Sequence, residues 1–138
     1  MINQALCTSF KYEILLGVHD LTHDAIYMAM YSNNATLGYS TTVYSQDGEV
    51  TGTGYTAGGK VLTNVTVNTD GYTAYVSFDN PTWSSATFTA RGALLYNASK
   101  GNRTIAVIDF GADKTASGSF TVQLPTNTAN SAIIRISI

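Results

Sequence analysis

The sequence has few charged residues and very little cysteine or proline. Charged side chains make up 12% of its 138 residues, against about 25% in an average soluble domain. Only seven residues are basic, and they are scattered along the chain. No basic patch is therefore available to neutralise a phosphate backbone, and we expect no nucleic-acid partner.

Other absences exclude further classes of protein. A single cysteine, Cys7, can form neither an intramolecular disulfide nor a multi-cysteine zinc site, and it fits folding in a reducing cytosol. No uninterrupted apolar run approaches the roughly 18 residues of a membrane-spanning helix, so we expect no membrane partner. The first residues, MINQALCTSFKYE, lack the basic and apolar regions of a secretory signal. We therefore expect synthesis in the cytoplasm without a signal peptide.

The residues that take the place of charge are typical of β-structure. Apolar side chains make up 44% of the chain and the net charge is only -2, which excludes a disordered protein. Much of the remainder is Thr, Ser, Asn and Gly, and there are nine Tyr. Neither a linker nor a repeat divides the chain, so residues 1–138 are expected to form one domain.

Residues 1–18 contain the one segment with a helical pattern. Phe10 and Ile14 are spaced to share one face of a helix near 9–16, and Gly17 stands where a left-handed terminating residue belongs. A helix this short is unstable alone in water. We therefore expect this N-terminal arm to dock on the rest of the chain or on a partner.

The chain after Ala25 alternates short apolar runs with turn signals. Asp70-Gly71 predicts a hairpin, Arg91-Gly92 a bulge or bend, and the residues around Ala112–Gly118 a turn between two further strands. About eight short strands at this spacing predict an all-β fold, an antiparallel β-sandwich or jelly roll with a short N-terminal helix.

Residues 32–59 form a long segment rich in Gly and Thr, with one short strand predicted near Thr41–Tyr44. A loop of this length in a compact domain is either functional or ordered by a partner. Its glycines at 52–59 superficially resemble a phosphate-binding loop, but the Lys-Ser/Thr end of that motif is absent. The segment is therefore expected to take its shape from a partner rather than to bind a nucleotide.

Catalytic and metal-binding patterns are sparse. His19 and His23 have the spacing that chelates a metal on a helix, but Gly17 ends the helix before them, so a turn segment is the preferred interpretation. Both histidines lie in one loop, and no G-x-S-x-G motif supplies a nucleophile. We expect no enzyme activity, no cofactor and no bound metal, with His19 and His23 as the remaining metal candidates.

The aromatic residues admit two interpretations, sugar or protein contact on one hand and ordinary strand packing on the other. Tyr72 and Tyr96 fall on the apolar phase of their strands, so packing is expected for both. A protein interface is the better interpretation for residues in the loose segment and on the apolar face of the arm. These interface candidates are Phe10, Ile14, Tyr39, Tyr44 and Tyr55.

Four blocks of sequence resemble a family of small proteins encoded in the structural-gene regions of tailed bacteriophages and prophages. They are FKYEILLGVHDLTHDAIYMAMYSNNATL, EVTGTGYTAGGKVLTN, TWSSATFTARGALLYN and VIDFGADKTASGSFTVQLP. The resemblance extends from about Phe10 to the end of the sequence. The blocks contain no catalytic motif, so no residue's role is carried over from the family.

The resemblance implies a virion protein made in the host cytoplasm, most specifically a capsid cement or decoration protein. Its expected partners are the major capsid protein and sister subunits, with a homo-oligomer such as a trimer. The low surface charge weakens a usual barrier to self-association. The alternatives are a receptor- or glycan-binding module on a tail or head fibre, and a tail adaptor component.

Overall fold

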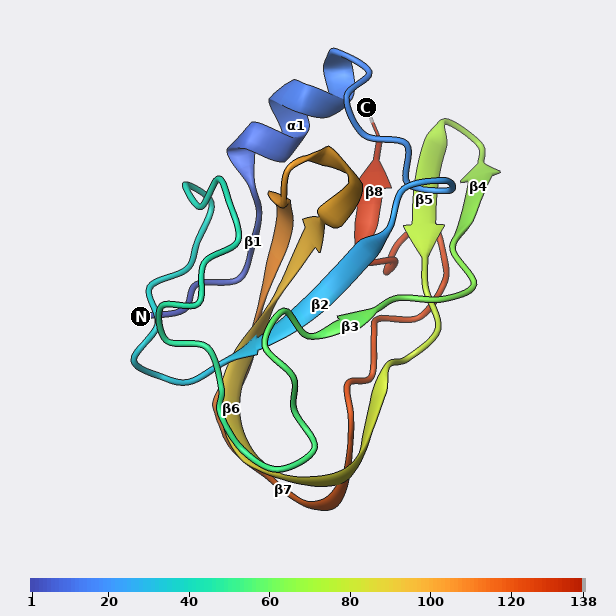
Figure 1. Ribbon diagram of the computed structural model, residues 1–138. Helices are drawn as coiled ribbons and strands as arrows, with labels where there is room; N and C mark the ends of the chain where they lie inside the picture. Colours follow the sequence, from blue (N-terminus) through green and yellow to red (C-terminus); the bar gives the residue numbers. More distant parts are fainter. Residues whose placement is uncertain (138) are drawn as a thin grey trace.

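Two antiparallel sheets and one short α-helix make up the structure, a computed structural model that describes residues 1–137 (Figure 1). The larger sheet has the strand order β1-β7-β6-β2-β3, and the smaller has the order β4-β5-β8. The predicted all-β fold with a sandwich-like layout is confirmed, whereas the jelly-roll topology stays a prediction. The elements are β1 (Ala5–Leu6), α1 (Thr8–Leu15), β2 (Ile26–Tyr31), β3 (Lys60–Val61), β4 (Thr66–Asp70), β5 (Thr73–Ser77), β6 (Thr82–Asn97), the 3-10 helix η1 (Ala98–Lys100), β7 (Arg103–Thr121) and β8 (Ile134–Ile136).

A long hairpin of β6 and β7 forms the centre of the larger sheet. The bulge predicted at Arg91-Gly92 is confirmed as a register shift between Ala90 and Gly92. The turn predicted around 112–118 is wrong, because these residues continue in β7 and pair with β6. Gly111 and Gly118 adopt φ values of 82° and 113°, so the turn-forming residues distort the strand without reversing it.

The larger sheet is buried on both faces at its centre. Consecutive residues of β6, Ala93–Leu95, are all fully buried, a pattern that requires cover on each side of a strand. The helix α1 packs against β7. From the 32–59 segment, the Tyr44 ring stacks on Tyr96 at 4.6 Å and the Tyr55 ring meets Phe88 edge-on at 5.6 Å. The core therefore joins the arm, the sheet and the long loop.

The 32–59 segment contains no named strand, and it is held by its own chain. The strand predicted near Thr41–Tyr44 is reduced to a single bridge between Val43 and Arg103. Ala35, Leu37 and Val50 of this segment are buried. These buried apolar side chains hold the loop in place, although it forms no regular ladder of strand hydrogen bonds.

The predicted helix is confirmed, and Gly17 follows it with φ +75°. The predicted hairpin at Asp70-Gly71 is also confirmed, with Asp70 paired to Thr73. The prediction for Tyr72 is wrong: it lies in the turn itself and is 78% exposed. Tyr96, predicted in the same way, is 4% exposed, as expected of a packed strand residue.

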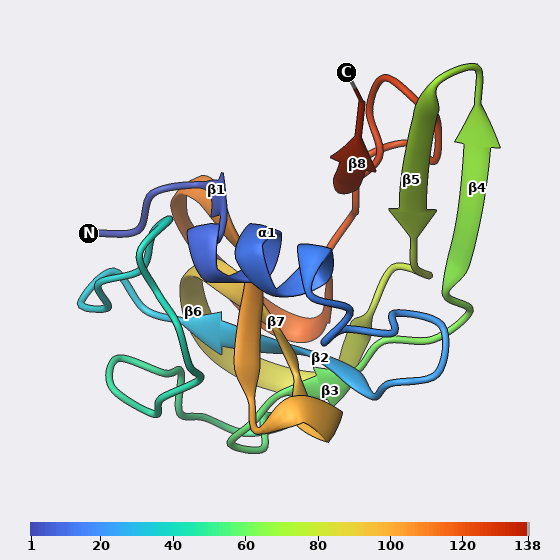
Figure 2. The ribbon, with the colours of Figure 1, turned by 90° about the horizontal axis from the view of Figure 1, so that it is seen from above.

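The smaller sheet projects from the body of the molecule, on the side toward which α1 ends (Figures 1 and 2). All five residues of β4 are exposed. Its position leaves one sheet face beside α1 and leaves β4 as a free edge. Within residues 1–137, no helix is long and apolar enough to cross a membrane.

Candidate functional site

The helix α1, the β4–β5 hairpin and β8 lie toward one end of the molecule (Figure 1) and carry most of the exposed large apolar side chains among residues 1–137. Six of the ten such side chains among the described residues belong to these elements or to the residue that ends α1. We call these six the apical surface. They are Tyr12, Leu15, Leu16, Val67, Tyr72 and Ile136.

A groove of about 420 Å³ runs between α1 and the smaller sheet beside the apical surface. The smaller sheet lines one side of the groove. Val67 pairs with Val76, and Val76 pairs with Ile134, so the three side chains lie on the same face of the sheet. Ile14 of α1 and Leu21 line the opposite side. Val67 and the α1 residue Leu15 remain 50% and 86% exposed. Exposed apolar side chains beside an apolar groove make this part of the surface a candidate contact site.

The predicted interface residues do not gather in one place. Phe10 is 1% exposed and packs on the His19 ring, with 5.1 Å between ring centroids. Ile14 lines the apical groove. Tyr39 is 67% exposed on the long loop, at a distance in sequence from the apical elements. Ile14 and Tyr39 therefore stay interface predictions, in different parts of the molecule.

Tyr44 and Tyr55, also predicted for an interface, instead direct their hydroxyl groups inward to Glu49. Tyr44 donates to Oε1 of Glu49 at 2.6 Å, and Tyr55 donates to Oε2 at 2.5 Å. The N–H of Gly58 donates to the same Oε2 at 2.8 Å. Burial and the bond to Glu49 raise the pKa of each tyrosine. One carboxylate thus ties three points of the 32–59 segment together.

His19 occupies a buried polar network. Its Nδ1 accepts from the Asn97 amide at 2.9 Å, so the ring proton belongs on Nε2, which donates to Glu13 at 2.9 Å. Asn97 also donates to Asp24 at 2.8 Å, and Lys100 donates to Asp24 at 2.8 Å. Burial acts to raise the pKa of Asp24, but these bonds prevail and lower it to about 2. The network joins α1 to β6 and η1, and it leaves no free ring nitrogen on His19.

His23 lies apart from this network. Its Nδ1 is 2.7 Å from Asp20 on an exposed turn. The two histidines thus bind different partners, as the turn interpretation expects. Across residues 1–137, no three His, Cys, Asp or Glu side chains come together as a metal site requires. Cys7 is fully buried, and burial raises the pKa of its thiol.

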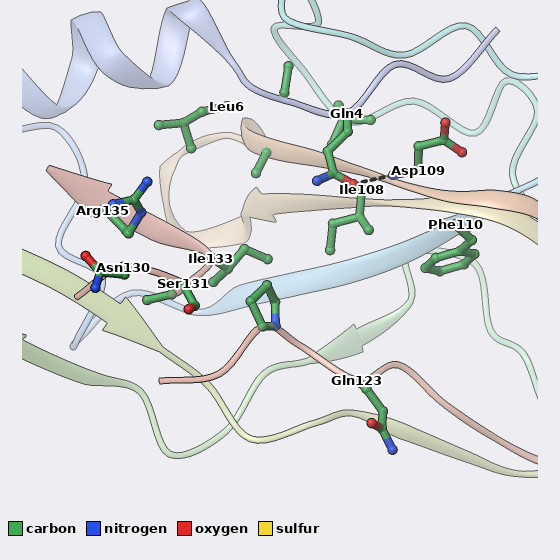
Figure 3. Close-up of a pocket in the computed structure, with 15 residues that line it drawn as sticks. Gln4, Leu6, Ile108, Asp109, Phe110, Gln123, Asn130, Ser131, Ile133 and Arg135 are labelled. Atoms are coloured by element: carbon green, nitrogen blue, oxygen red, sulfur yellow. Dashed lines mark hydrogen bonds between the residues drawn. The ribbon is translucent and has the colours of Figure 1, made fainter. Parts of the chain in front are cut away.

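A cleft of about 660 Å³ lies between β1, β7 and the chain that leads into β8. Figure 3 shows Gln4 beside Asp109, whose N–H donates to the Oε1 of Gln4 at 3.3 Å, and Arg135 apart from this pair. Asp109 is the sole carboxylate of its lining, and it accepts from the Arg91 Nε at 3.0 Å. That bond lowers the pKa of Asp109. The cleft therefore lacks the paired carboxyl groups of a glycosidase.

None of the six residues of the apical surface was among the interface candidates predicted from the sequence. Val67 stands in the polar run Thr-Val-Asn-Thr-Asp, where one valine gives no sign that its strand is uncovered. No protein-family model, curated protein or solved structure matches the chain.

Proposed function

We propose that this protein is a virion structural component of a tailed bacteriophage, a capsid cement or decoration protein that joins neighbouring capsid subunits. The apical surface is the observation that carries the proposal. It places six large apolar side chains on the outside of a chain in which 12% of residues are charged. Such a surface favours contact with other proteins over solvation.

The proposed mechanism is burial of apolar area at subunit joints. Each Å² removed from water contributes about 25 cal/mol before the costs of association are subtracted. The buried network around His19 fixes α1, one element of the contact surface, to β6. A fixed surface loses little conformational entropy on docking, which supports a structural role. The proposed partners are the major capsid protein and sister subunits.

The glycan-binding alternative depends on aromatic rings that share an exposed face. Trp83, the single tryptophan, is 4% exposed, and the rings of Tyr44 and Tyr55 pack inside the molecule. A glycan site would therefore have to use the exposed rings of Tyr12 and Tyr72 on the apical surface or of Tyr39 on the long loop.

Copy number per particle tests the proposal most directly. Quantitative mass spectrometry of purified particles should find hundreds of copies, since a cement protein occupies repeated capsid joints. Particles that lack the protein should also lose integrity at lower temperature or in chelator. Absence from purified particles would contradict the proposal, whereas tens of copies or fewer would favour the tail adaptor or fibre alternatives.

The apical surface can be tested by rebinding to particles that lack the protein. Combining Leu15→Ser with Val67→Ser should weaken rebinding at least about tenfold, because both side chains leave the proposed joint. Val43→Ser is the matched control, since Val43 is 51% exposed but lies on the long loop. Equal losses in the double variant and the control would argue against the apical surface as the contact.

A further inference from the structure

The free edge strands of the two sheets differ in how they are protected. In the larger sheet, β1 covers β7 only as far as Val107, so the rest of β7 has a free outer edge. This part of β7 contains Lys114 and the positive-φ glycines Gly111 and Gly118. Charged side chains and irregular backbone are the features that keep edge strands from pairing with other chains. The edge strand β4, with the sequence Thr-Val-Asn-Thr-Asp, contains no Lys, Pro or Gly, and all of its residues are exposed. It is the longer unprotected edge of the smaller sheet.

The hairpin geometry determines which backbone groups of β4 point outward. Asp70 and Thr73 flank a two-residue turn, so they form a hydrogen-bonded pair. Pairs alternate along an antiparallel ladder, so Asn68 also directs its N–H and C=O toward β5. Val67 and Thr69 direct theirs away from β5. Within residues 1–137, no hydrogen bond reaches these outward groups.

We propose that β4 pairs antiparallel with β4 of a second copy of this chain, across a two-fold axis centred on Asn68. In this register Val67 lies opposite the second copy's Thr69, so the outward N–H and C=O groups of each satisfy the other. Asn68 lies opposite Asn68 as the close, non-hydrogen-bonded pair. The two smaller sheets then form one continuous sheet.

The sequence of β4 favours a second copy as the occupant. The register pairs the strand from end to end, and it places Asp70, the single charge of β4, opposite Thr66 rather than opposite another acid. Val67 of both copies lies on the groove side, so the apolar groove faces also become continuous. This inference does not depend on the proposed function, because it concerns the purified protein alone.

The pairing should be weak in dilute solution. A five-residue strand pair buries less than the roughly 1,200 Å² of a standard interface, so we expect a dissociation constant on the order of 0.1 mM. Sedimentation equilibrium of the full chain up to about 1 mM should show a monomer–dimer equilibrium. A two-fold strand pair stops at a dimer, which distinguishes it from the trimer expected from sequence.

Opposite charges at Asn68 test the register. Asn68→Asp alone and Asn68→Lys alone should each weaken dimerisation about tenfold or more, because like charges then lie opposite each other. An equimolar mixture of the two variants should restore the dimer. Asn34→Asp and Asn34→Lys are matched controls, because Asn34 is exposed in the long loop, and they should dimerise as the unmodified chain does.

Several results would overturn the inference. They are a monomer at all concentrations, self-association insensitive to charge at Asn68, and failure of the Asp and Lys variants to restore a dimer when mixed. Far-UV circular dichroism of each variant establishes that it is folded. Loss of particle binding with intact dimerisation would contradict the proposed function alone, so the two proposals fail separately.

Discussion

The two sheets differ in the polarity of their strands and in what covers them. In the larger sheet, the centre of β6 is packed on both faces, and Leu94 and Leu95 are fully buried. In the smaller sheet, β4 is exposed along its whole length, and Val67 keeps half of its surface in water. The comparison teaches that burial follows composition here, because Ala93–Leu95 of β6 are all apolar, whereas Val67 is the one apolar residue of β4. The larger sheet contains most of the core, and the smaller sheet carries part of the proposed contact surface.

The largest expected difference in unfolding free energy concerns two glycines that both have positive φ angles. Gly59→Ala should cost more than about 4 kcal/mol of unfolding free energy, because a Cβ there would lie 1.9 Å from the carbonyl oxygen of Met28 at φ +82°. Gly71→Ala, at φ +60° in the hairpin of the smaller sheet, meets nothing within 4 Å and should cost about 1 kcal/mol. Urea unfolding monitored by circular dichroism measures both. Equal costs would mean that the two regions are packed alike.

The next effect concerns the carboxylate that fixes the long loop against the larger sheet. Glu49→Gln should cost about 2–3 kcal/mol, because an amide replaces one of two oxygens that accept from Tyr44, Tyr55 and Gly58. Asp47→Asn, at an exposed position of the same loop, is the control and should be neutral within about 0.5 kcal/mol. Urea midpoints of the two variants test this, and a neutral Glu49→Gln would show that the aromatic contacts suffice.

A smaller effect follows from the acid titration of Asp24. Its pKa is about 2 in the folded chain and about 4 when unfolded, so its charged form favours folding. This contribution, about 1–2 kcal/mol, is present above pH 4 and is lost as the pH falls from about 4 to about 2. Asp24→Asn should remove this part of the pH dependence. The unfolding free energies of the unmodified protein and of Asp24→Asn, measured from pH 5 to pH 2, test this prediction. Equal losses of stability in the two proteins would contradict it.

The smallest effect on stability should come from the apical surface itself. Leu15→Ser and Val67→Ser should each change the unfolding free energy by less than about 0.5–1 kcal/mol, because both side chains are exposed in the isolated chain. Thermal unfolding of the purified variants measures this. A large loss of stability would mean that these residues support the fold rather than contact.

Sequence patterns predicted the fold class, the short helix, the β4–β5 hairpin and the β6 bulge, because each depends on local signals such as Gly17 and Asp70-Gly71. They failed where packing overrides local chemistry. Gly111 and Gly118 have turn chemistry but stay in β7, since pairing with β6 resumes at Lys114 after an irregularity that includes Gly111. The role of Asn97 depends on His19 and Asp24, which are distant in sequence, so no local pattern could reveal it. Glu49 bonds to nearby residues of its own loop, but that loop is irregular and no repeating pattern describes it.

Strand order also bears on how the chain folds. The β6–β7 hairpin joins neighbours in sequence and can form early, whereas β8 reaches β5 only after the whole of that hairpin has been placed. The smaller sheet is therefore the last to be completed. The strand β8 contributes Ile134 and Ile136 to the groove. We therefore expect the proposed contact surface to form only after the core has folded, which limits association of partly folded chains.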